Sequence, residues 1–277
     1  MTMTDLQAFD VETDDHGVTT VTLIGPGRGN AMGPEFWTEL PALFARLGTD
    51  PGTRAIVLTG TGSCFSVGLD LKRVAEPEFL PAVRDRAMAA DRLTLLQRLR
   101  QLQAAMTAVA DCRKPVLAAI HGWCLGGGVD LAACVDVRYC SADAVFSIRE
   151  ARVAIVADAG SLQRLPAIIG DGALRELALT GKDIDAARAL QIGLVNEVLP
   201  DRDAVLRRAV DTAREMAANP QFVLHGIKDV LAQQSASAVA GGLNYVTAWN
   251  AAFLPSHDLA EAVVALGERR PPVFSDN

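Results

Sequence analysis

Three acidic residues in the middle of the chain, Asp130, Glu150 and Asp158, stand where carboxyl groups could exchange protons with a substrate. Asp130 follows a run of glycines, Glu150 follows a short apolar segment, and Asp158 lies among small and apolar neighbours. Because an isolated carboxylate in apolar surroundings is costly to ionise, its pKa should be raised. Such a group suits acid–base catalysis near neutral pH. The alternative for each acid, taken alone, is an exposed turn or a helix cap.

A glycine triplet, Gly126–Gly128, precedes Asp130 and follows an apolar segment. Glycines at the head of a helix expose backbone N–H groups, and the helix dipole adds partial positive charge there. This arrangement suits a phosphate, a carboxylate or a developing oxyanion. Close packing of a helix on a strand explains the same triplet equally well.

A second glycine corner, Ser66–Asp70, follows a short apolar segment and a turn. Alone it predicts only an ordinary turn. Together with the first corner, it could supply a second backbone donor to the same oxygen atom.

Other chemistry is not indicated by the sequence. The glycine-rich segment Gly25–Asn30 lacks the spacing of phosphate-binding loops and predicts a structural turn. The four histidines are scattered, no G-x-S-x-G is present, and the five cysteines include no C-x-x-C pair. We therefore expect no metal site, no disulfide framework and no nucleophilic serine of that type.

The elements that must position these acids alternate along the first two-thirds of the chain. Apolar and β-branched runs predict strands at 18–23, 55–58, 116–120, 135–139 and 145–148. Helical spacing predicts helices at 34–47, 80–110 and 129–134. Short apolar strands alternating with helices indicate an α/β core whose strands are covered on both faces.

The pattern changes near residue 200. Helical periodicity predicts helices at 204–218, 222–233, 238–253 and 258–266, with no convincing strand. We therefore divide the chain into an α/β core with the active site, 1–200, and a helical oligomerisation region, 201–277. The alternative is that these helices only cover their own core.

The amino-acid composition argues against several further classes of protein. The 277 residues are 50% apolar and carry 33 acidic against 26 basic side chains, a net charge of −7, which favours a folded chain and disfavours nucleic-acid binding. The longest apolar stretch, 115–129, is interrupted by His121, so no membrane insertion is expected. Residues 1–15 show no signal peptide, and alanine and arginine are frequent. These features predict a cytoplasmic protein of bacterial origin.

Several motifs together resemble the crotonase (enoyl-CoA hydratase/isomerase) superfamily, in order and over nearly the whole chain. The central match is His121–Leu131 (HGWCLGGGVDL), with Cys64–Asp70 (CFSVGLD) upstream. The further matches are Lys114-Pro115, Gly29–Met32 (GNAM), Gln163–Pro166 (QRLP) and Ala187–Val198 (ARALQIGLVNEV).

Within that superfamily the chain is most similar to the Δ3,5-Δ2,4-dienoyl-CoA isomerases. The residues that carry this similarity are Gly126–Asp130, Asp136–Cys140, Glu150, Ala157-Asp158 and Leu243–Asn250. Hydratases of the superfamily usually have glutamates at the positions of Asp130 and Glu150 and a glycine at the position of Asp158. Three acids, with aspartate first, resemble the isomerase pattern.

This resemblance implies an α/β fold: a spiral of ββα units followed by a C-terminal α-helical trimerisation region. It implies a homo-oligomer, either a trimer or a dimer of trimers, and an acyl-CoA thioester as substrate. Coenzyme A is then part of the substrate, and no separate cofactor is required. The implied reaction moves the double bonds of a 3,5-dienoyl-CoA to the 2,4 positions, as in the degradation of unsaturated acyl chains.

The resemblance also implies roles for single residues. The N–H groups of Leu69 and Gly127 would form the oxyanion hole, Glu150 would exchange protons at C2, Asp158 at C6, and Asp130 would orient or tune the pair. The residues expected to lie along the bound coenzyme A are Ser66, Gly68, Leu69, Asp70, Lys72, Gly126, Gly127 and Lys228. Lys228 would reach a phosphate of a neighbouring subunit's ligand; a solvated surface lysine is the alternative.

Two other functions compete with this interpretation. An enoyl-CoA hydratase would add water to a 2-enoyl-CoA with Asp130 and Glu150, and a third acid, Asp158, argues against simple hydration. A non-catalytic scaffold or RNA-binding member of the fold is a rival of another class. The three retained acids and both glycine corners disfavour a scaffold, and the lack of a basic stripe disfavours RNA.

Overall fold

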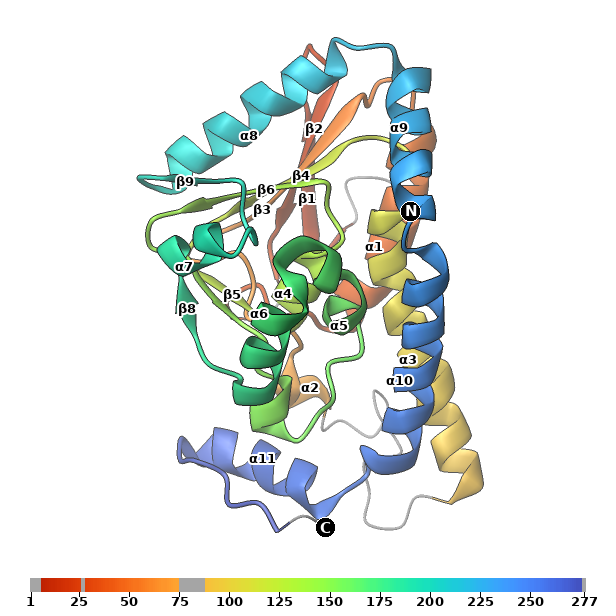
Figure 1. Cartoon of the computed structure of the whole chain (residues 1–277), viewed down its shortest axis with the longest axis vertical. Coiled ribbons are helices and arrows are strands. Elements are labelled where there is room, and N and C mark those ends of the chain that lie inside the picture. The colour runs from red at the N-terminus through yellow and green to blue at the C-terminus, as the bar shows by residue number, and fades with distance from the viewer. Residues whose placement is uncertain (1–5, 26–27, 75–87, 276–277) are drawn as a thin grey trace.

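The computed structural model describes residues 6–25, 28–74 and 88–275, which form two β-sheets surrounded by helices (Figure 1). The strands are β1 (Phe9–Thr13), β2 (Val18–Leu23), β3 (Ala55–Gly60), β4 (Val116–Ile120), β5 (Trp123–Leu125), β6 (Val137–Ser141), β7 (Val145–Ser147), β8 (Ile184–Asp185) and β9 (Glu197–Leu199). The helices are α1 (Pro34–Thr49), α2 (Leu71–Val74), α3 (Ala89–Ala110), α4 (Gly127–Ala132), α5 (Ser161–Arg164), α6 (Pro166–Thr180), α7 (Ala186–Gln191), α8 (Arg202–Ala217), α9 (Gln221–Gln233), α10 (Ala236–Phe253) and α11 (His257–Glu268). A 3-10 helix, Glu150–Val153, links β7 to the loop before α5.

The larger sheet has the order β1-β2-β3-β4-β6-β9. Only β1 and β2 run antiparallel; the other neighbours are parallel. Every residue of β3 and β4 is buried, as expected for central parallel strands covered on both faces. Because β3 and β4 are parallel neighbours, their carboxyl ends, and the segments that follow them, meet at one edge of the sheet.

The smaller sheet carries the chain from this edge to the acids. β5 pairs in parallel with β7, and β7 pairs antiparallel with β8. β5 leads directly into Gly126 and α4, whereas β7 leads into the 3-10 helix that begins at Glu150. The β5–β7 pairing therefore places the glycine triplet and Glu150 at the same end of this sheet.

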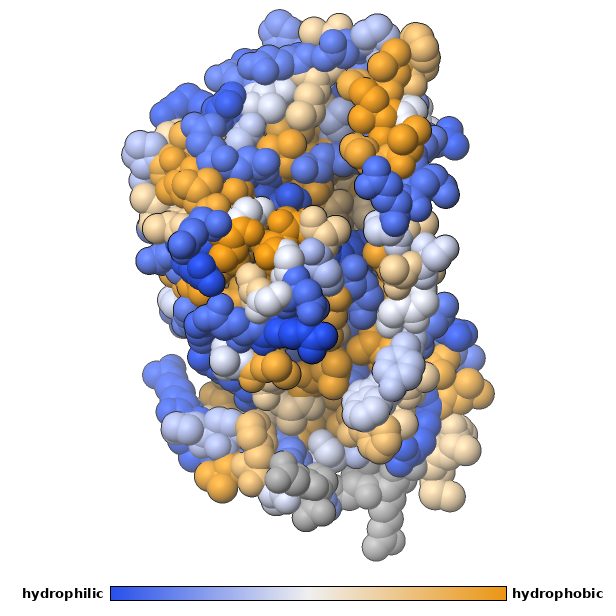
Figure 2. All heavy atoms as spheres, in the orientation of Figure 1, coloured by the Kyte–Doolittle hydropathy of each residue, from blue (hydrophilic) through white to orange (hydrophobic). Residues whose placement is uncertain are grey.

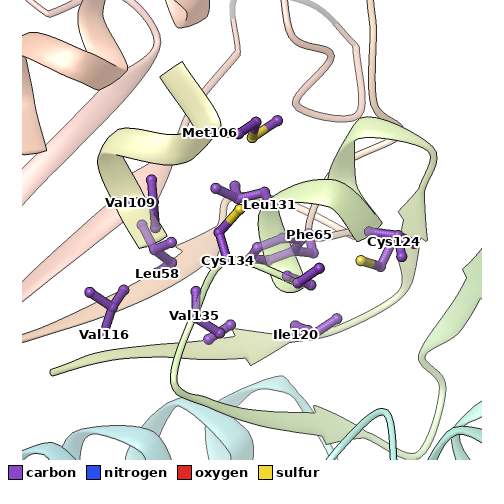
Figure 3. Packing of buried hydrophobic residues seen from close by; sticks show 14 of the residues in the cluster. Leu58, Phe65, Met106, Val109, Val116, Ile120, Cys124, Leu131, Cys134 and Val135 are labelled. Carbon is purple, nitrogen blue, oxygen red and sulfur yellow. The ribbon is translucent and has the colours of Figure 1, made fainter. Parts of the chain in front are cut away.

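Helices cover both faces of the larger sheet. One apolar cluster joins the side chains of Val57 and Leu117 to those of Val205 and Ala209 on α8. On the opposite face, α1, α3 and α4 bury a larger cluster. Figure 3 shows part of it, in which Met106 and Val109 of α3 lie close to Leu131 of α4. The helix that carries Asp130 is thus fixed in the centre of the core.

The C-terminal helices also contact the core. α10 packs against α3 and α5, and α11 packs against the 3-10 helix that begins at Glu150. A third apolar cluster joins buried leucines of α3 to Leu254 and Leu259 at the C-terminal end of the fold. No helix within the described residues is both long and apolar enough to cross a membrane.

Most predicted elements are present, and four strands were not predicted. The predicted helix at 80–110 begins at Ala89, and its first part, 80–87, lies outside the described residues. β1, β8 and β9 were missed because they are short or partly exposed, which leaves no apolar run to mark them. β5 was missed because its three residues lie within the apolar stretch 115–129, where nothing marks them as a separate strand. The division at residue 200 stays a prediction; α8, beyond it, covers one face of the core sheet.

Candidate active site

The two glycine corners lie side by side. Two hydrogen bonds join them: Ser66 N–H donates to the Trp123 carbonyl at 3.0 Å, and Leu125 N–H donates to the Ser66 carbonyl at 3.0 Å. These bonds continue the alignment of β3 and β4 beyond the end of the sheet. The segment around Gly68 is thereby held against the segment that enters α4.

Two backbone N–H groups, of Leu69 and Gly127, lie close together at this junction. A methyl group built on Gly127 would come within 3.6 Å of the Leu69 nitrogen, and one built on Gly68 within 2.8 Å of the Gly127 nitrogen. Within the part of the chain that the structure describes, neither N–H donates to a protein acceptor. Two neighbouring free donors at the start of a helix can bind one oxygen that carries negative charge.

The corners need glycine for two different reasons. Gly68 has a φ of +80°, and a side chain there would lie 2.5 Å from the Leu125 carbonyl. Gly128 is helical, but a methyl group on it would lie 2.8 Å from the Ser66 carbonyl. Close packing is thus present at Gly128, whereas Gly127 offers a free donor and its binding of an oxyanion stays a prediction.

Asn30, in the turn after β2, holds the first corner in place with side-chain hydrogen bonds. Its side-chain amide donates to the carbonyl oxygens of Thr61, Cys64 and Phe65 at 2.9–3.1 Å. Ser66 adds a bond in the reverse direction, because its hydroxyl donates to the Asn30 carbonyl at 2.8 Å. Asn30 is the last residue of the segment predicted as a structural turn, Gly25–Asn30, of which 26 and 27 lie outside the described residues; Asn30 itself supports the donor corner.

The three acids come together in one buried region. Asp130 lies in the first turn of α4, Glu150 begins the 3-10 helix, and Asp158 lies in the loop that leads to α5. Asp130 and Asp158 both act electrostatically on Glu150, so the carboxyl groups are close enough to influence one another. The sequence prediction of three adjacent carboxyls is consistent with this placement.

Asp130 is the most deeply buried of the three, at 2% exposure. Its Oδ1 accepts the backbone N–H of Ser161, at the start of α5, at 2.6 Å. Burial raises the pKa of Asp130, while the Ser161 hydrogen bond and the nearby Arg164 guanidinium oppose that rise. Arg164 is itself held by α3, because it donates to the Thr107 hydroxyl at 3.2 Å.

Glu150 faces the glycine corner with an unsatisfied oxygen. Its Oε1 would lie 3.1 Å from a methyl group on Gly126, and its buried Oε2 has no hydrogen-bond partner among the described residues. Burial, followed by the charge of Asp130, raises the pKa of Glu150 to about 8. Glu150 thus places Oε1 beside the glycine corner and leaves Oε2 without a protein partner.

Asp158 is held by two carboxamides from distant helices. Asn250 of α10 donates from Nδ2 to Asp158 Oδ2 at 2.6 Å, and Gln103 of α3 donates from Nε2 to the Asp158 main-chain oxygen at 2.8 Å. The pKa of Asp158 is raised to about 7. Burial is the main cause, the charge of Asp130 adds to it, and the hydrogen bond from Asn250 opposes it. Asp158 is therefore fixed in place yet can exchange a proton near neutral pH.

Together the three carboxyls cannot all ionise easily at neutral pH. The charge of Asp130 raises the pKa values of Glu150 and Asp158, and the charge of Asp158 raises that of Glu150, so the group holds protons that exposed acids would have released. A cluster that shares protons beside two free N–H donors can take a proton from one carbon of a bound molecule and give one to another.

The residues expected along coenzyme A are only partly brought together. Gly68, Leu69, Gly126 and Gly127 form the junction itself. Asp70 closes the first turn of α2, because its Oδ1 accepts Lys72 N–H at 3.2 Å, and the Lys72 side chain is exposed beside it.

Ser66 is held inside the first glycine corner. It is fully buried, and its hydroxyl donates to Asn30 and accepts the Gly68 N–H at 3.1 Å. The hydroxyl therefore both donates and accepts within the corner and helps to shape the donor site, while the expected position of Ser66 along coenzyme A stays a prediction.

Lys228 lies far from the junction of its own chain. Its ammonium group pairs with Asp136 at 2.6 Å and donates to the Lys114 carbonyl at 3.1 Å. Lys114 and Asp136 precede β4 and β6, whereas the junction follows β4 at its other end. The expected contact of Lys228 with a neighbouring subunit's ligand stays a prediction, and within one chain the side chain forms an ion pair.

Sequence reasoning assigned no role to Gln103, Asn250, Ser161 or Arg164. Asn250 lies inside a motif that contributed to the family resemblance, but its contact with Asp158 spans 92 residues. Polar residues are common in α3 and α5, so the sequence carries no signal that singles out Gln103, Ser161 or Arg164 or identifies a partner for them.

The chain matches a family model. The model described as enoyl-CoA hydratase/isomerase matches residues 13–277. Among solved structures, an enoyl-CoA hydratase/isomerase from Mycobacterium paratuberculosis superposes with a TM-score of 0.82 at 30% identity, covering 94% of this chain and 99% of that chain.

Curated relatives are similar over nearly the whole chain. A mitochondrial Δ3,5-Δ2,4-dienoyl-CoA isomerase from Dictyostelium discoideum is 37% identical over 276 residues, covering 99% of this chain and 94% of the relative. A peroxisomal enzyme of the same name from Arabidopsis thaliana is 37% identical over 278 residues, covering 99% of both. The human mitochondrial enzyme of that name is 37% identical over 265 residues, covering 95% of this chain and 80% of the relative.

These relatives overturn one prediction. A cytoplasmic, bacterial protein was expected, whereas the relatives' names place them in mitochondria or peroxisomes of eukaryotes. The expectation rested on the frequency of alanine and arginine and on the appearance of residues 1–15. Amino-acid composition affects folding and surface charge but carries no compartment address, so it was a poor guide.

The buried acids predict that stability falls as the pH rises. The folded state holds the pKa of Glu150 at about 8, above its ordinary value of 4.5, so the folded protein binds a proton that the unfolded chain releases between these values. We expect the free energy of unfolding of Glu150→Gln to match that of the parent near pH 4. Above pH 8 it should exceed the parent's by about 1–3 kcal/mol.

Urea denaturation from about pH 4 to about pH 9 measures this difference. Glu12→Gln, at an exposed position of β1, serves as control and should change the unfolding free energy by less than about 0.5 kcal/mol at any pH. A Glu150→Gln protein that is no more stable than the parent at high pH would contradict the burial argument.

Proposed function

The chain belongs to the enoyl-CoA hydratase/isomerase family, and we propose that it isomerises a 3,5-dienoyl-CoA to a 2,4-dienoyl-CoA by proton transfer between carboxyl groups. Its relatives at 37% identity carry the name of that isomerase. The observation that carries the proposal is Asp158, a third proton-exchanging acid fixed beside Glu150 and Asp130. Addition of water alone does not call for a third acid.

The chemistry begins at C2 of the thioester. Removal of the C2 proton is favourable in this substrate because it gives an extended dienolate, whose charge reaches the thioester oxygen. We assign this step to the Glu150 carboxylate, through the oxygen that has no protein partner. Asp158 then delivers a proton to C6, and the double bonds move from the 3,5 to the 2,4 positions.

The reaction leaves an extra proton on Glu150 and removes one from Asp158. A proton must therefore return between the two carboxyls, directly or through water, before the next turnover. The pKa values of both carboxyls are raised towards neutral pH, so either group can hold the proton there. Asp130 supports the exchange because its negative charge raises both pKa values.

The oxyanion is assigned to the two free N–H groups, of Leu69 and Gly127. They lie together at the start of α4 and have no acceptor within the described residues. Donors that already point at the developing charge stabilise the transition state more than the ground state. The substrate brings its own coenzyme A, and the proposed chemistry needs no separate cofactor.

We further propose that the chain forms a homo-oligomer, a trimer or a dimer of trimers. α9 exposes a row of apolar side chains, and Figure 2 shows hydrophobic residues gathered over it. These side chains are Phe222, Val223, Ile227, Val230 and Leu231. An exposed apolar face of this length is characteristic of an interface between protein chains.

The isomerase proposal predicts a spectroscopic signal. Incubation with a 3,5-dienoyl-CoA should produce the ultraviolet absorbance of a conjugated 2,4-dienoyl thioester. Asp158→Asn should reduce kcat by about 100-fold or more, because the variant has no acid to protonate C6. Undiminished turnover in Asp158→Asn would refute the role of that acid, and hydration of a 2-enoyl-CoA as the main activity would favour a hydratase.

The oxyanion assignment predicts a contrast between two glycines. Gly68→Ala should lower kcat by about 100-fold, because the new methyl group would displace the Gly127 N–H and the Leu125 carbonyl. Gly62→Ala is the matched control, since Gly62 also has a positive φ, of +67°, but nothing lies within 4 Å of a side chain there. Equal losses of kcat in both variants would attribute the effect to backbone strain alone.

The assembly proposal predicts a mass of three or six times 29.3 kDa in light scattering after size-exclusion chromatography. Val230→Glu should shift the protein to smaller species, because a carboxylate in an apolar interface is costly to desolvate. Leu179→Glu, at a 79% exposed position of α6, is the control and should leave the mass unchanged. A monomeric parent protein would contradict the proposal.

A further inference from the structure

Asn250 lies in the last turn of α10 and is 2% exposed, although its side chain is polar. Its Nδ2 donates two hydrogen bonds into the loop before α5. One goes to the Val156 carbonyl at 2.8 Å, and the other to Asp158 Oδ2 at 2.6 Å. Both hydrogens of one amide group therefore serve the segment that carries the third acid.

The Val156 carbonyl fixes which way the Asn250 amide points. A carbonyl oxygen can only accept, so the amide must present its NH₂ group and not its oxygen to Val156. The same NH₂ group then faces Asp158, and Oδ2 must accept. When Asp158 is protonated, the proton is consequently carried by the other oxygen, Oδ1.

We propose that Asn250 is a positioning residue for Asp158, which holds Oδ2 as an acceptor and leaves Oδ1 to deliver the proton to C6. This inference rests on the isomerisation proposed above. As Asp158 gives up its proton, the bond from Asn250 becomes charge-assisted and stronger. Asn250 therefore stabilises the step in which the acid ionises more than the state before it.

The charges around Asp158 make such a donor necessary. The charge of Asp130 from α4 opposes ionisation of Asp158, and the charge of Asp158 in turn raises the pKa of Glu150 in the 3-10 helix. Arg164 of α5 acts on Asp130. α3 and α10 present neutral carboxamides, Gln103 and Asn250. Within the described residues, Asn250 supplies the side-chain hydrogen bond that favours the ionised form of Asp158.

Gln103 of α3 provides a matched control, because it contacts the same loop. Its Nε2 donates to the main-chain oxygen of Asp158 at 2.8 Å and to the Leu243 carbonyl of α10 at 3.1 Å. Loss of Gln103 loosens the segment, but it takes no donor from the carboxyl group. A comparison of variants at Gln103 and Asn250 therefore distinguishes a general loosening of the loop from a specific effect on the Asp158 carboxyl group.

The kinetic test compares Asn250→Leu with Gln103→Leu. Asn250→Leu should lower kcat about 10- to 100-fold with a much smaller change in KM, and should move the alkaline limb of the pH–kcat profile about 1–2 pH units higher. Gln103→Leu should leave that limb in place, whatever activity it loses. An unmoved limb in Asn250→Leu, or an equal shift in both variants, would overturn the proposal.

A second readout does not depend on the reaction. The urea midpoint lost on Asn250→Leu should be larger above about pH 8 than below about pH 6, because only an ionised Asp158 loses a charge-assisted bond. In the Asp158→Asn background that pH dependence should disappear. If the parent protein fails to isomerise the dienoyl-CoA, the proposed function fails, while this cycle still tests the Asn250–Asp158 bond.

Asn250→Ser provides the second variant in case leucine prevents folding. Its smaller side chain fits the space and is too short to reach both acceptors, so it should shift the alkaline limb in the same direction. A pH-independent loss of midpoint in either variant would show that Asn250 only packs α10 against the loop.

Discussion

The burial of three carboxyl groups beside one another is the constraint on which the rest of the structure depends. Desolvation and mutual repulsion both oppose ionisation of Asp130, Glu150 and Asp158, and unpaired buried charge is costly. The fold offsets part of this cost with the Ser161 N–H at Asp130 and the Asn250 amide at Asp158. Glu150 Oε2 is left unsatisfied, and that is where a substrate can gain an interaction the protein lacks.

The donor site and the acid site are built by different means. The N–H groups of Leu69 and Gly127 are set by backbone pairing that continues beyond parallel β3 and β4, so their placement depends on glycines and main-chain bonds. The acids instead depend on helices packed around them, including α3 and α10 from distant parts of the chain. Consequently each glycine corner can be recognised from a short stretch of sequence. The protonation states of the acids depend instead on side chains that only the tertiary structure brings near them.

This difference explains what the sequence could predict. The glycine corners and the acids are local patterns, and the parallel apolar strands bring them to one edge of the sheet. The contacts of Asp158 with Gln103 and Asn250 span 55 and 92 residues, so no spacing rule reveals them. The hydrogen bonds of Ser66 within its corner were likewise not predicted, because the sequence does not show whether a serine hydroxyl at a corner faces a ligand or stabilises the turn.

α10 has one face that is buried at the acid site and another that is exposed at the surface. Asn250 and Thr247 are buried, while Tyr245, Trp249 and Phe253 are exposed and contact one another along the opposite side. A partner chain that covered this aromatic row would restrict the helix that carries the donor to Asp158. Since a hydrogen bond weakens steeply as its geometry departs from the optimum, such restriction would act on the acid itself. The C-terminal helices would then contribute to catalysis as well as to assembly, because the side chain that tunes the third acid lies in one of them.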